Sequence, residues 1–466
     1  MTTWSFSFSD GTPMDIELLN DDCLVALKKL PDNSVDSVCT DPPSGTALLR
    51  NSWDDFEDPN STDPKGLAAR KPFVQFITQV FTEVHRVLKP GAFGLVWSLP
   101  RTSSWTATGL EDAGFHVVDV LTHIFSNGWP KHQAALKPSN EHWILIKKDS
   151  EGTIAENLWK HGVGALQIDA CRMTAGEGVR GRWPSNTIFS HASGCQYLGT
   201  KQIQGQKTAE RPPDTVSPTG WGHQRQDGLI QYPTDENGLE TIESWKCVPE
   251  CPVGALEHSN PLTSRFFPQL EADLPFTYQS KVSQEEKSAG THSLYWKKTT
   301  EGFKSISFVE WVQLGEDERK LQKETGKVES IRGQGNLHPT VKPVSLILWM
   351  LKLICPPGGT VLDCFLGSGT TACAALLGGF NCVGIERDPT YFVIAQARLD
   401  YTRTRMEVQK NTMKQQDLGL GLPLPVDNPV GNPVGNPVGT QGITGLKLSP
   451  DRIARLVRKA SKKVSN

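Results

Sequence analysis

The first 150 residues alternate between short apolar runs and segments with helical spacing. The run at 16–19 has the length of a strand, whereas apolar residues recur three and four positions apart between Phe73 and Leu88, as on one face of a helix. Strands that alternate with helices predict an α/β fold with a largely parallel sheet. The pattern predicts strands over 16–19, 35–39, 93–98, 115–125 and 143–146, and helices over 22–30, 73–88 and 103–113.

The stretch from 361 to 386 predicts a strand, a glycine turn, a helix and a further strand. Gly367 and Gly369 carry no Cβ, so a ligand can approach the turn closely, with the helix N-terminus pointing at it. Glu386 ends the second strand, where its carboxylate can accept hydrogen bonds from both hydroxyls of a ribose. The unit therefore predicts a nucleoside-like cofactor. Taken alone it also satisfies the loose dinucleotide fingerprint, so a nicotinamide oxidoreductase stays open.

The alternation of strands and helices stops between residues 148 and 338, and again after residue 404. The middle stretch is rich in Gly, Pro, Ser and Trp and is too long for a loop, so we expect it to have a folded core of its own. Three tandem Asn-Pro-Val-Gly copies at 428–439 predict a linker. The stretch 446–466 is basic with an apolar stripe, which predicts either a DNA-contacting helix or a solvated tail.

Bulk properties narrow the class of protein. The 466-residue chain has 37% hydrophobic and 21% charged residues, as soluble proteins do, and its net charge of −3 gives no global attraction to nucleic acid. Any DNA-binding face must be a local concentration of Lys and Arg. We find no secretion signal and no apolar run near the ~20 residues that span a bilayer, so we expect a cytoplasmic protein without membrane contact. The ten cysteines should be reduced or bound to metal.

Two polar elements decide between the readings of the glycine turn. An Asp-Pro-Pro-Ser sequence at 41–44 follows the predicted strand at 35–39, and His-Pro-Thr-Val-Lys-Pro at 338–343 precedes the cofactor unit. An Asp-Pro-Pro sequence at a strand end presents a carboxylate and a proline carbonyl as neighbouring acceptors. This arrangement suits the transfer of a group to an amine, whereas a nicotinamide enzyme has no need of it. The candidate catalytic residues are Asp41, Pro42, Pro43 and Ser44.

At these residues the chain resembles the β class of DNA amino-methyltransferases, which use S-adenosylmethionine. In that class the catalytic motif, usually Asp-Pro-Pro-Tyr, comes first and the Phe-x-Gly-x-Gly cofactor motif last, as 41–44 and 365–369 do here. Segments 136–141, 181–186 and 264–267 also resemble phage and bacterial members with a long inserted region. The resemblance implies a permuted Rossmann-like methyltransferase fold of the α/β class with an irregular target-recognition insert.

The resemblance also divides the chain into segments. The two halves of one methyltransferase domain are 1–150, with the catalytic motif, and 336–407, with the cofactor motif. Residues 151–335 form the inserted recognition region. A Pro/Gly linker at 408–445 and a basic tail helix at 446–466 complete the chain.

For the reaction, the resemblance implies that Asp41 and the carbonyl of Pro42 accept the two N–H groups of an adenine or cytosine amine. Accepting both bonds draws the nitrogen toward tetrahedral geometry and releases its lone pair for attack on the methyl group. No covalent intermediate is required, and the rate would come from positioning and electrostatics.

For the cofactor, Thr340 and Lys342 would meet the methionine carboxylate, and Asp363 the ammonium group. Asp22 would contact the adenine, although an Asp before a helix is also a typical N-cap. The residues implied to bind the cofactor are Asp22, Thr340, Lys342, Asp363, Phe365, Gly367, Gly369 and Glu386.

Ser44 departs from the family pattern. A flipped target base is usually held on an aromatic face, and a Tyr or Phe normally stands at this position. Trp53, Phe56 or Trp129 could supply the missing face, although core packing is an alternative role for each. The departure also leaves open a protein that binds DNA without catalysis.

The insert contains four soft metal ligands in two pairs, each with three residues between its members. His191 with Cys195 and Cys247 with Cys251 could close on one tetrahedral Zn²⁺, which would stabilise a loop-rich segment. The alternative is a solvated histidine and three cysteines that fill a small core.

We therefore expect a cytoplasmic enzyme that flips a base out of double-stranded DNA and methylates it from S-adenosylmethionine. N6 of adenine is the preferred target, because Asp at the first motif position is commoner in adenine enzymes of this class. N4 of cytosine is the near alternative, since the same chemistry serves both amines. Membership of a restriction–modification system, a partner nuclease and a homodimer are left open by the sequence.

Overall fold

A computed structural model describes most of the chain, in two units. One unit comprises Met1–Thr291 with Asn336–Glu407, and the other His292–Gly335 with Val408–Asn466. We describe each unit by itself. The described residues are 2–7, 13–46, 52–57, 67–126, 128, 136–173, 179–192, 194–205, 209–210, 229–230, 233–270, 287–299, 302–307, 310–311, 314–315 and 332–417.

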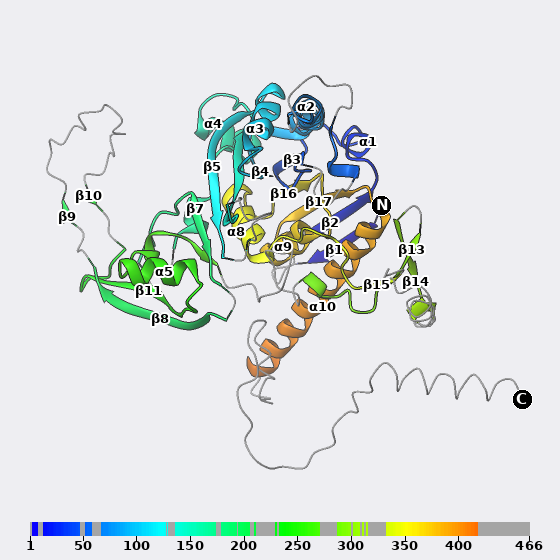
Figure 1. The fold of residues 1–466 in the computed structure, drawn as a ribbon. Coiled ribbons are helices and arrows are strands. Elements are labelled where there is room, and N and C mark those ends of the chain that lie inside the picture. Colours follow the sequence, from blue (N-terminus) through cyan, green and yellow to red (C-terminus); the bar gives the residue numbers. More distant parts are fainter. Residues whose placement is uncertain are drawn as a thin grey trace, which may run out of the picture. The chain divides into compact units, whose positions relative to one another are not determined.

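The larger unit is built on one ten-stranded sheet (Figure 1). Five adjacent strands, β2, β17, β16, β3 and β4, are parallel to one another. β1 is antiparallel to β2, and β6 is antiparallel to both β4 and β5. In order across the sheet, the strands are β1 (Thr2–Ser7), β2 (Pro13–Asn20), β17 (Asn381–Glu386), β16 (Thr360–Asp363), β3 (Val35–Thr40), β4 (Leu88–Ser98), β6 (Asn140–Lys147), β5 (His116–Ile124), β7 (Thr187–Ser190) and β12 (Gln269–Leu270).

Helices cover both faces of this sheet. The core on one face contains residues of α1, α2 and α3, and the core on the other contains residues of α8, α9 and α10. This three-layer arrangement follows from the sequence, because β3 is buried at all six positions and needs apolar cover on both sides. The bounds are α1 (Cys23–Leu27), α2 (Arg70–Val87), α3 (Ser103–Asp112), α8 (Val344–Ile354), α9 (Thr370–Gly378) and α10 (Pro389–Asp417).

The permuted order places a topological switch point in the middle of the sheet. β16 leads through α9 to β17 on one side, whereas β3 leads through α2 to β4 on the other. At such a point the connections diverge and leave a crevice outside the carboxyl ends of the two strands. Asp363 ends β16 and Asp41 follows β3, so both candidate acids lie at this crevice. The permuted Rossmann-like α/β fold is thereby confirmed.

The middle region is less separate from the main sheet than its sequence predicts. Its strands β7 and β12 extend the main sheet beyond β5, and Ile188 and Leu270 lie in the main core. Among the described residues of this region, a small cluster formed by Ala192, Cys195, Cys251 and Val253 and their neighbours is a separate core. The region's remaining elements are α4 (Ile154–His161), η3 (Ile168–Cys171), β8 (Gln196–Gln204), β9 (Ala209–Glu210), β10 (Leu229–Ile230), β11 (Leu239–Lys246), α5 (Pro252–Ser259) and η4 (Ser264–Phe266).

The smaller unit contains a three-stranded sheet with β13 (Tyr295–Thr299) between β14 (Gly302–Ile306) and β15 (Arg332–Gln334). Trp296 is buried at its centre and its Nε1 donates a hydrogen bond to the carbonyl of Gly335 at 2.9 Å.

The last described helix extends into the segment that the sequence predicts to be a linker. α10 runs to Asp417, past residue 408 where the linker is expected to begin, and the rest of the linker and the basic tail lie outside the described residues. The structure contains all ten cysteines as free thiols. Among the described helices, none combines the length and the apolar character needed to cross a membrane.

Candidate functional site

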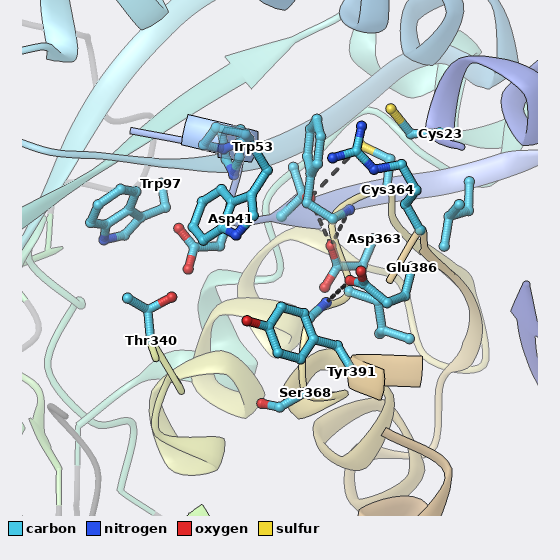
Figure 2. A pocket seen from close by; sticks show the side chains of 18 of the residues that line it. Cys23, Asp41, Trp53, Trp97, Thr340, Asp363, Cys364, Ser368, Glu386 and Tyr391 are labelled. Carbon is cyan, nitrogen blue, oxygen red and sulfur yellow. Dashed lines mark hydrogen bonds between the residues drawn. The ribbon is translucent and has the colours of Figure 1, made fainter. Parts of the chain in front are cut away.

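A cavity of about 760 Å³ opens at the switch point. Figure 2 shows Asp41, Trp53 and Trp97 toward one side of it and Asp363, Glu386 and Cys23 toward the other. Eleven of the residues predicted for catalysis or cofactor binding line this cavity. They are Asp22, Asp41, Pro42, Pro43, Ser44, Thr340, Lys342, Asp363, Phe365, Gly367 and Glu386.

The glycine turn forms the floor between β16 and α9. Gly367 has φ +55° and Gly369 has φ +81°, a region that side chains rarely adopt. A Cβ at Gly367 would stand 2.7 Å from Nε2 of His338, and one at Gly369 would stand 2.8 Å from Cβ of Ala395. Gly369 is not among the described residues that line the cavity, so its glycine serves the close packing of α10.

Arg398 of α10 fixes the turn from behind. This buried guanidinium donates to the carbonyl and hydroxyl of Ser368 and to the hydroxyl of Thr370, at 2.8, 3.0 and 3.0 Å. Thr370 in turn donates to the carbonyl of Lys342 at 3.2 Å. The cofactor turn and the 338–343 element are therefore held as one rigid wall.

Two carboxyl groups in this wall titrate far above their usual range. Burial raises the pKa of Asp363 to about 6 and that of Glu386 to about 7. Asp363 accepts from the hydroxyl of Thr40 at 2.7 Å, and Glu386 accepts from the amide of Gly367 at 2.8 Å. Both groups would gain from a ligand that brings a cation or hydroxyl donors, because such partners favour the ionised form.

Where the cofactor wall meets the Asp-Pro-Pro loop, Lys342 forms an ion pair with Asp41. The ammonium also lies 4.2 Å from the centre of the Trp97 ring. Lys342 is only 7% exposed at its side chain, so the pair is shielded from solvent. The family resemblance implies different ligands for these two residues, whereas the structure brings them into contact.

Ser44 lines the cavity, and its hydroxyl is hydrogen-bonded within the protein. It donates to Oδ2 of Asp54 at 2.7 Å, and the amide of Gly45 donates to Oδ1 of the same carboxylate at 2.8 Å. Asp54 is fully buried and ends the short helix η2 (Ser52–Asp54), which also carries Trp53. Ser44 thus connects the catalytic loop to a neighbouring turn.

Asp22 is the N-cap of α1 and also lines the cavity. Its Oδ1 accepts from the amide of Leu24 at 3.0 Å. Capping fixes the carboxylate at the cavity's edge.

Several residues of the site were missed from sequence. Burial lowers the pKa of His338 to about 3, so this ring is neutral; it lies edge-on to Tyr391 at 4.5 Å. Behind Trp97, the buried Glu141 accepts from the indole at 2.5 Å and contacts Nδ1 of His123 at 2.8 Å. His338 and Glu141 stand in segments that carry the family resemblance, which was a usable signal, whereas nothing marked Tyr391.

A second cluster lies in the insert, away from the cavity. One ligand atom from each of His191, Cys195, Cys247 and Cys251 lies within 4.8 Å of the others. The Sγ atoms of Cys247 and Cys251 are 3.5 and 3.6 Å from Nδ1 of His191. Tetrahedral zinc, with Zn–S near 2.3 Å and Zn–N near 2.0–2.1 Å, separates S from N by about 3.5 Å. The observed spacing fits that ion.

Backbone amides support the sulfur atoms of this cluster. Ala192 and Gly254 donate to Sγ of Cys251, and Val248 donates to Sγ of Cys195, each at 3.5 Å. Such outer hydrogen bonds orient ligands and stabilise their negative charge.

The chain is similar in sequence to DNA methylases and type II methyltransferases. The family model for N6/N4 DNA methylases matches residues 35–397. Type II methyltransferase M.BglI of Bacillus subtilis is 37% identical over 92 residues, which are 18% of this chain and 26% of that protein. M.HinfI of Haemophilus influenzae is 42% identical over 62 residues, 13% of this chain and 17% of that protein. The matched stretches thus span about a quarter or less of these relatives.

Solved structures give a weaker likeness. The cytosine-N4-specific PvuII DNA methyltransferase has a TM-score of 0.38 at 12% identity and covers 82% of this chain and 85% of its own. The M1.HpyAVI–SAM complex has a TM-score of 0.34 at 14% identity and covers 82% and 100%. Scores of this size decide nothing about function. The family match, however, spans both the catalytic loop and the cofactor turn, and the chain belongs to the N6_N4_Mtase family of DNA methylases.

Proposed function

We propose that this chain transfers a methyl group from S-adenosylmethionine to an exocyclic amine of a base in double-stranded DNA. The observation that carries the proposal is the single cavity that joins the Asp-Pro-Pro loop to the cofactor turn. A loop with two acceptors at one end and a buried acidic wall at the other suits an amine and a cationic nucleoside together.

The donor end of the cavity is formed by acidic, hydroxyl and ammonium groups. Glu386 would accept the ribose hydroxyls, Asp363 would face the ammonium group, and Thr340 and Lys342 would meet the carboxylate. When bound, S-adenosylmethionine supplies an electrophilic methyl group on its sulfonium. The turn at Gly367, which Arg398 holds in place, would bind S-adenosylmethionine without rearrangement.

The base end of the cavity is formed by Asp41 and the carbonyl of Pro42. Together they would accept both N–H groups of the amine and fix its lone pair toward the donor. The departing proton would pass to Asp41 or to water. We propose N6 of adenine as the target, because Asp at the first motif position is commoner in adenine enzymes of this class. N4 of cytosine is the alternative, since the same chemistry serves both amines.

Transfer of labelled methyl from S-adenosylmethionine to unmethylated genomic DNA, followed by nucleoside mass spectrometry, tests this function. Methylated adenine or cytosine in the DNA would support it and identify the base. Donor binding without incorporation would overturn it in favour of a DNA-binding protein without catalysis.

We also propose that His191, Cys195, Cys247 and Cys251 hold one structural Zn²⁺. The distances around His191 and the amide-to-sulfur bonds support it. The ion would connect the β7 end of the main sheet to β11 and α5, elements with few apolar contacts of their own. Metal analysis of the purified protein should give one zinc per chain, and absence of bound metal would remove the proposal.

A further inference from the structure

The aromatic residues of the cavity differ in how free their ring faces are. Lys342 occupies a face of Trp97, whose indole N–H is bound to Glu141. Trp143 is 1% exposed and belongs to the core. Neither ring is free to receive a planar ligand.

The three phenylalanines that line the cavity, Phe56, Phe76 and Phe365, pack on one another and on the buried Phe73. Phe56 lies 5.3 Å from Phe73 and from Phe76, and Phe76 lies 5.9 Å from Phe365. All four belong to the core that covers one face of the sheet, or pack against it. They form a hydrophobic wall rather than an open face.

Trp53 is different. It lines the cavity, is half-buried, and stacks on no other ring within the described part of the chain. Figure 2 shows its indole on the same side of the pocket as Asp41. A half-exposed indole beside an amine-accepting carboxylate has the chemistry of a stacking surface for a base.

The structure also explains how Trp53 is held there. The next residue, Asp54, is fully buried and accepts from the hydroxyl of Ser44 and the amide of Gly45. Burying a carboxylate costs free energy, which these hydrogen bonds offset only in one geometry. Ser44 itself is fixed from the other side, because Thr102 donates to its carbonyl at 3.2 Å. The η2 turn is therefore attached to the catalytic loop at the residue that departs from the family pattern.

We propose that Trp53 is the residue on which the extruded target base stacks, and that Ser44 and Asp54 are positioning residues that deliver it. A serine at this position provides no aromatic face, but it anchors the η2 turn, which carries the ring of Trp53. The inference rests on the proposed function and adds to it the residue that holds the base.

The test uses the full-length protein and four variants. Trp53→Ala should lower kcat/KM for unmethylated genomic DNA by about 10- to 100-fold, with the Kd for S-adenosylmethionine unchanged. Trp53→Phe should restore most of the activity, because a ring face remains. Ser44→Ala should lower kcat/KM as well, because it frees the η2 turn. Trp159→Ala, a matched control at a tryptophan 90% exposed on α4, should behave as wild type.

A second readout separates base stacking from a structural role. Once the methylated position is mapped, a fluorescent base analogue placed there should be quenched by wild-type protein and remain bright with Trp53→Ala, since an extruded base would then lack its ring. Wild-type turnover by Trp53→Ala, or equal loss of donor binding and turnover, would overturn the inference. Absence of methyl transfer by the wild type would overturn the proposed function and this inference with it.

Discussion

The ammonium of Lys342 contacts the carboxylate of Asp41 across 301 positions of sequence. One residue comes from the element before the cofactor unit and the other from the catalytic loop, so the pair lies where the donor end of the cavity meets the base end. While this ammonium is bound to Oδ2 of Asp41, that oxygen is not open to the N–H group of an arriving amine. If a donor carboxylate bound Lys342 it would free Asp41, and we therefore expect donor binding and base binding to be cooperative.

Asp41→Ala should abolish methyl transfer while donor binding is kept or improved. The alanine cannot accept the amine, and Lys342 is released for the donor. Because Lys342 is left unpaired at 7% exposure, the free energy of unfolding should also fall, by about 1–3 kcal/mol. Isothermal titration with S-adenosylmethionine and a methyl-transfer assay check this. Parallel loss of binding and turnover would mean that Asp41 only maintains the fold.

Lys342→Gln should weaken donor binding by about 10-fold or more, because a charge-assisted hydrogen bond to a carboxylate contributes about 1.5–3 kcal/mol. Lys89→Gln is the matched control. Lys89 pairs with Asp36 at 2.6 Å in the fold and does not line the cavity. Both variants should lose some thermal stability, but only Lys342→Gln should raise the Kd. Equal Kd values for the two would contradict a role of Lys342 at the donor.

Asp363→Asn should stabilise the unliganded protein in a pH-dependent manner. The pKa of Asp363 rises from an ordinary 3.8 to about 6 on folding, so its contribution to stability is complete below pH 4 and is lost as the pH rises through 6. The shift corresponds to about 3 kcal/mol at most. The melting temperature of the variant minus that of wild type should therefore grow between pH 4 and 7 and then level off.

Asp112→Asn, at an exposed position of α3, is the control for this series and should show no such difference. Donor affinity should follow the opposite trend in wild type, rising with pH through 6 as Asp363 ionises and attracts the ammonium group. A stability difference that does not change with pH would show that Asp363 is not the buried acid inferred here.

Much of the site could be predicted from sequence because its two motifs are local. The Asp-Pro-Pro loop and the glycine turn each constrain a few consecutive residues, and a strand precedes each. The pair of Lys342 with Asp41 could not be predicted in this way, since no local rule joins residues so far apart. The same holds for Glu141, whose partners Trp97 and His123 come from two other strands.

The fold shows the same division. The helical stripe of α2 and the buried run of β3 are strong periodic signals, and both elements are confirmed. β7 and β12 have four and two residues, too few to show a period, so their place in the main sheet is fixed only by tertiary pairing. For that reason the sequence predicts an insert that is more independent of the main sheet than the one in the structure.

Removal of one metal ligand should loosen the insert and leave the donor site intact. His191→Ala should lose the zinc, and limited proteolysis should then cut within the insert, because the cluster around Cys251 holds few apolar residues without an ion. His191→Cys keeps four ligands and should retain the metal. Cys171→Ala is the control, since burial raises the pKa of that thiol to about 12 and it stands outside the cluster. Metal content by mass spectrometry and donor Kd are the two measurements. A donor Kd that changes in step with metal content would show that the ion supports the whole fold, and metal retained by His191→Ala would place it elsewhere.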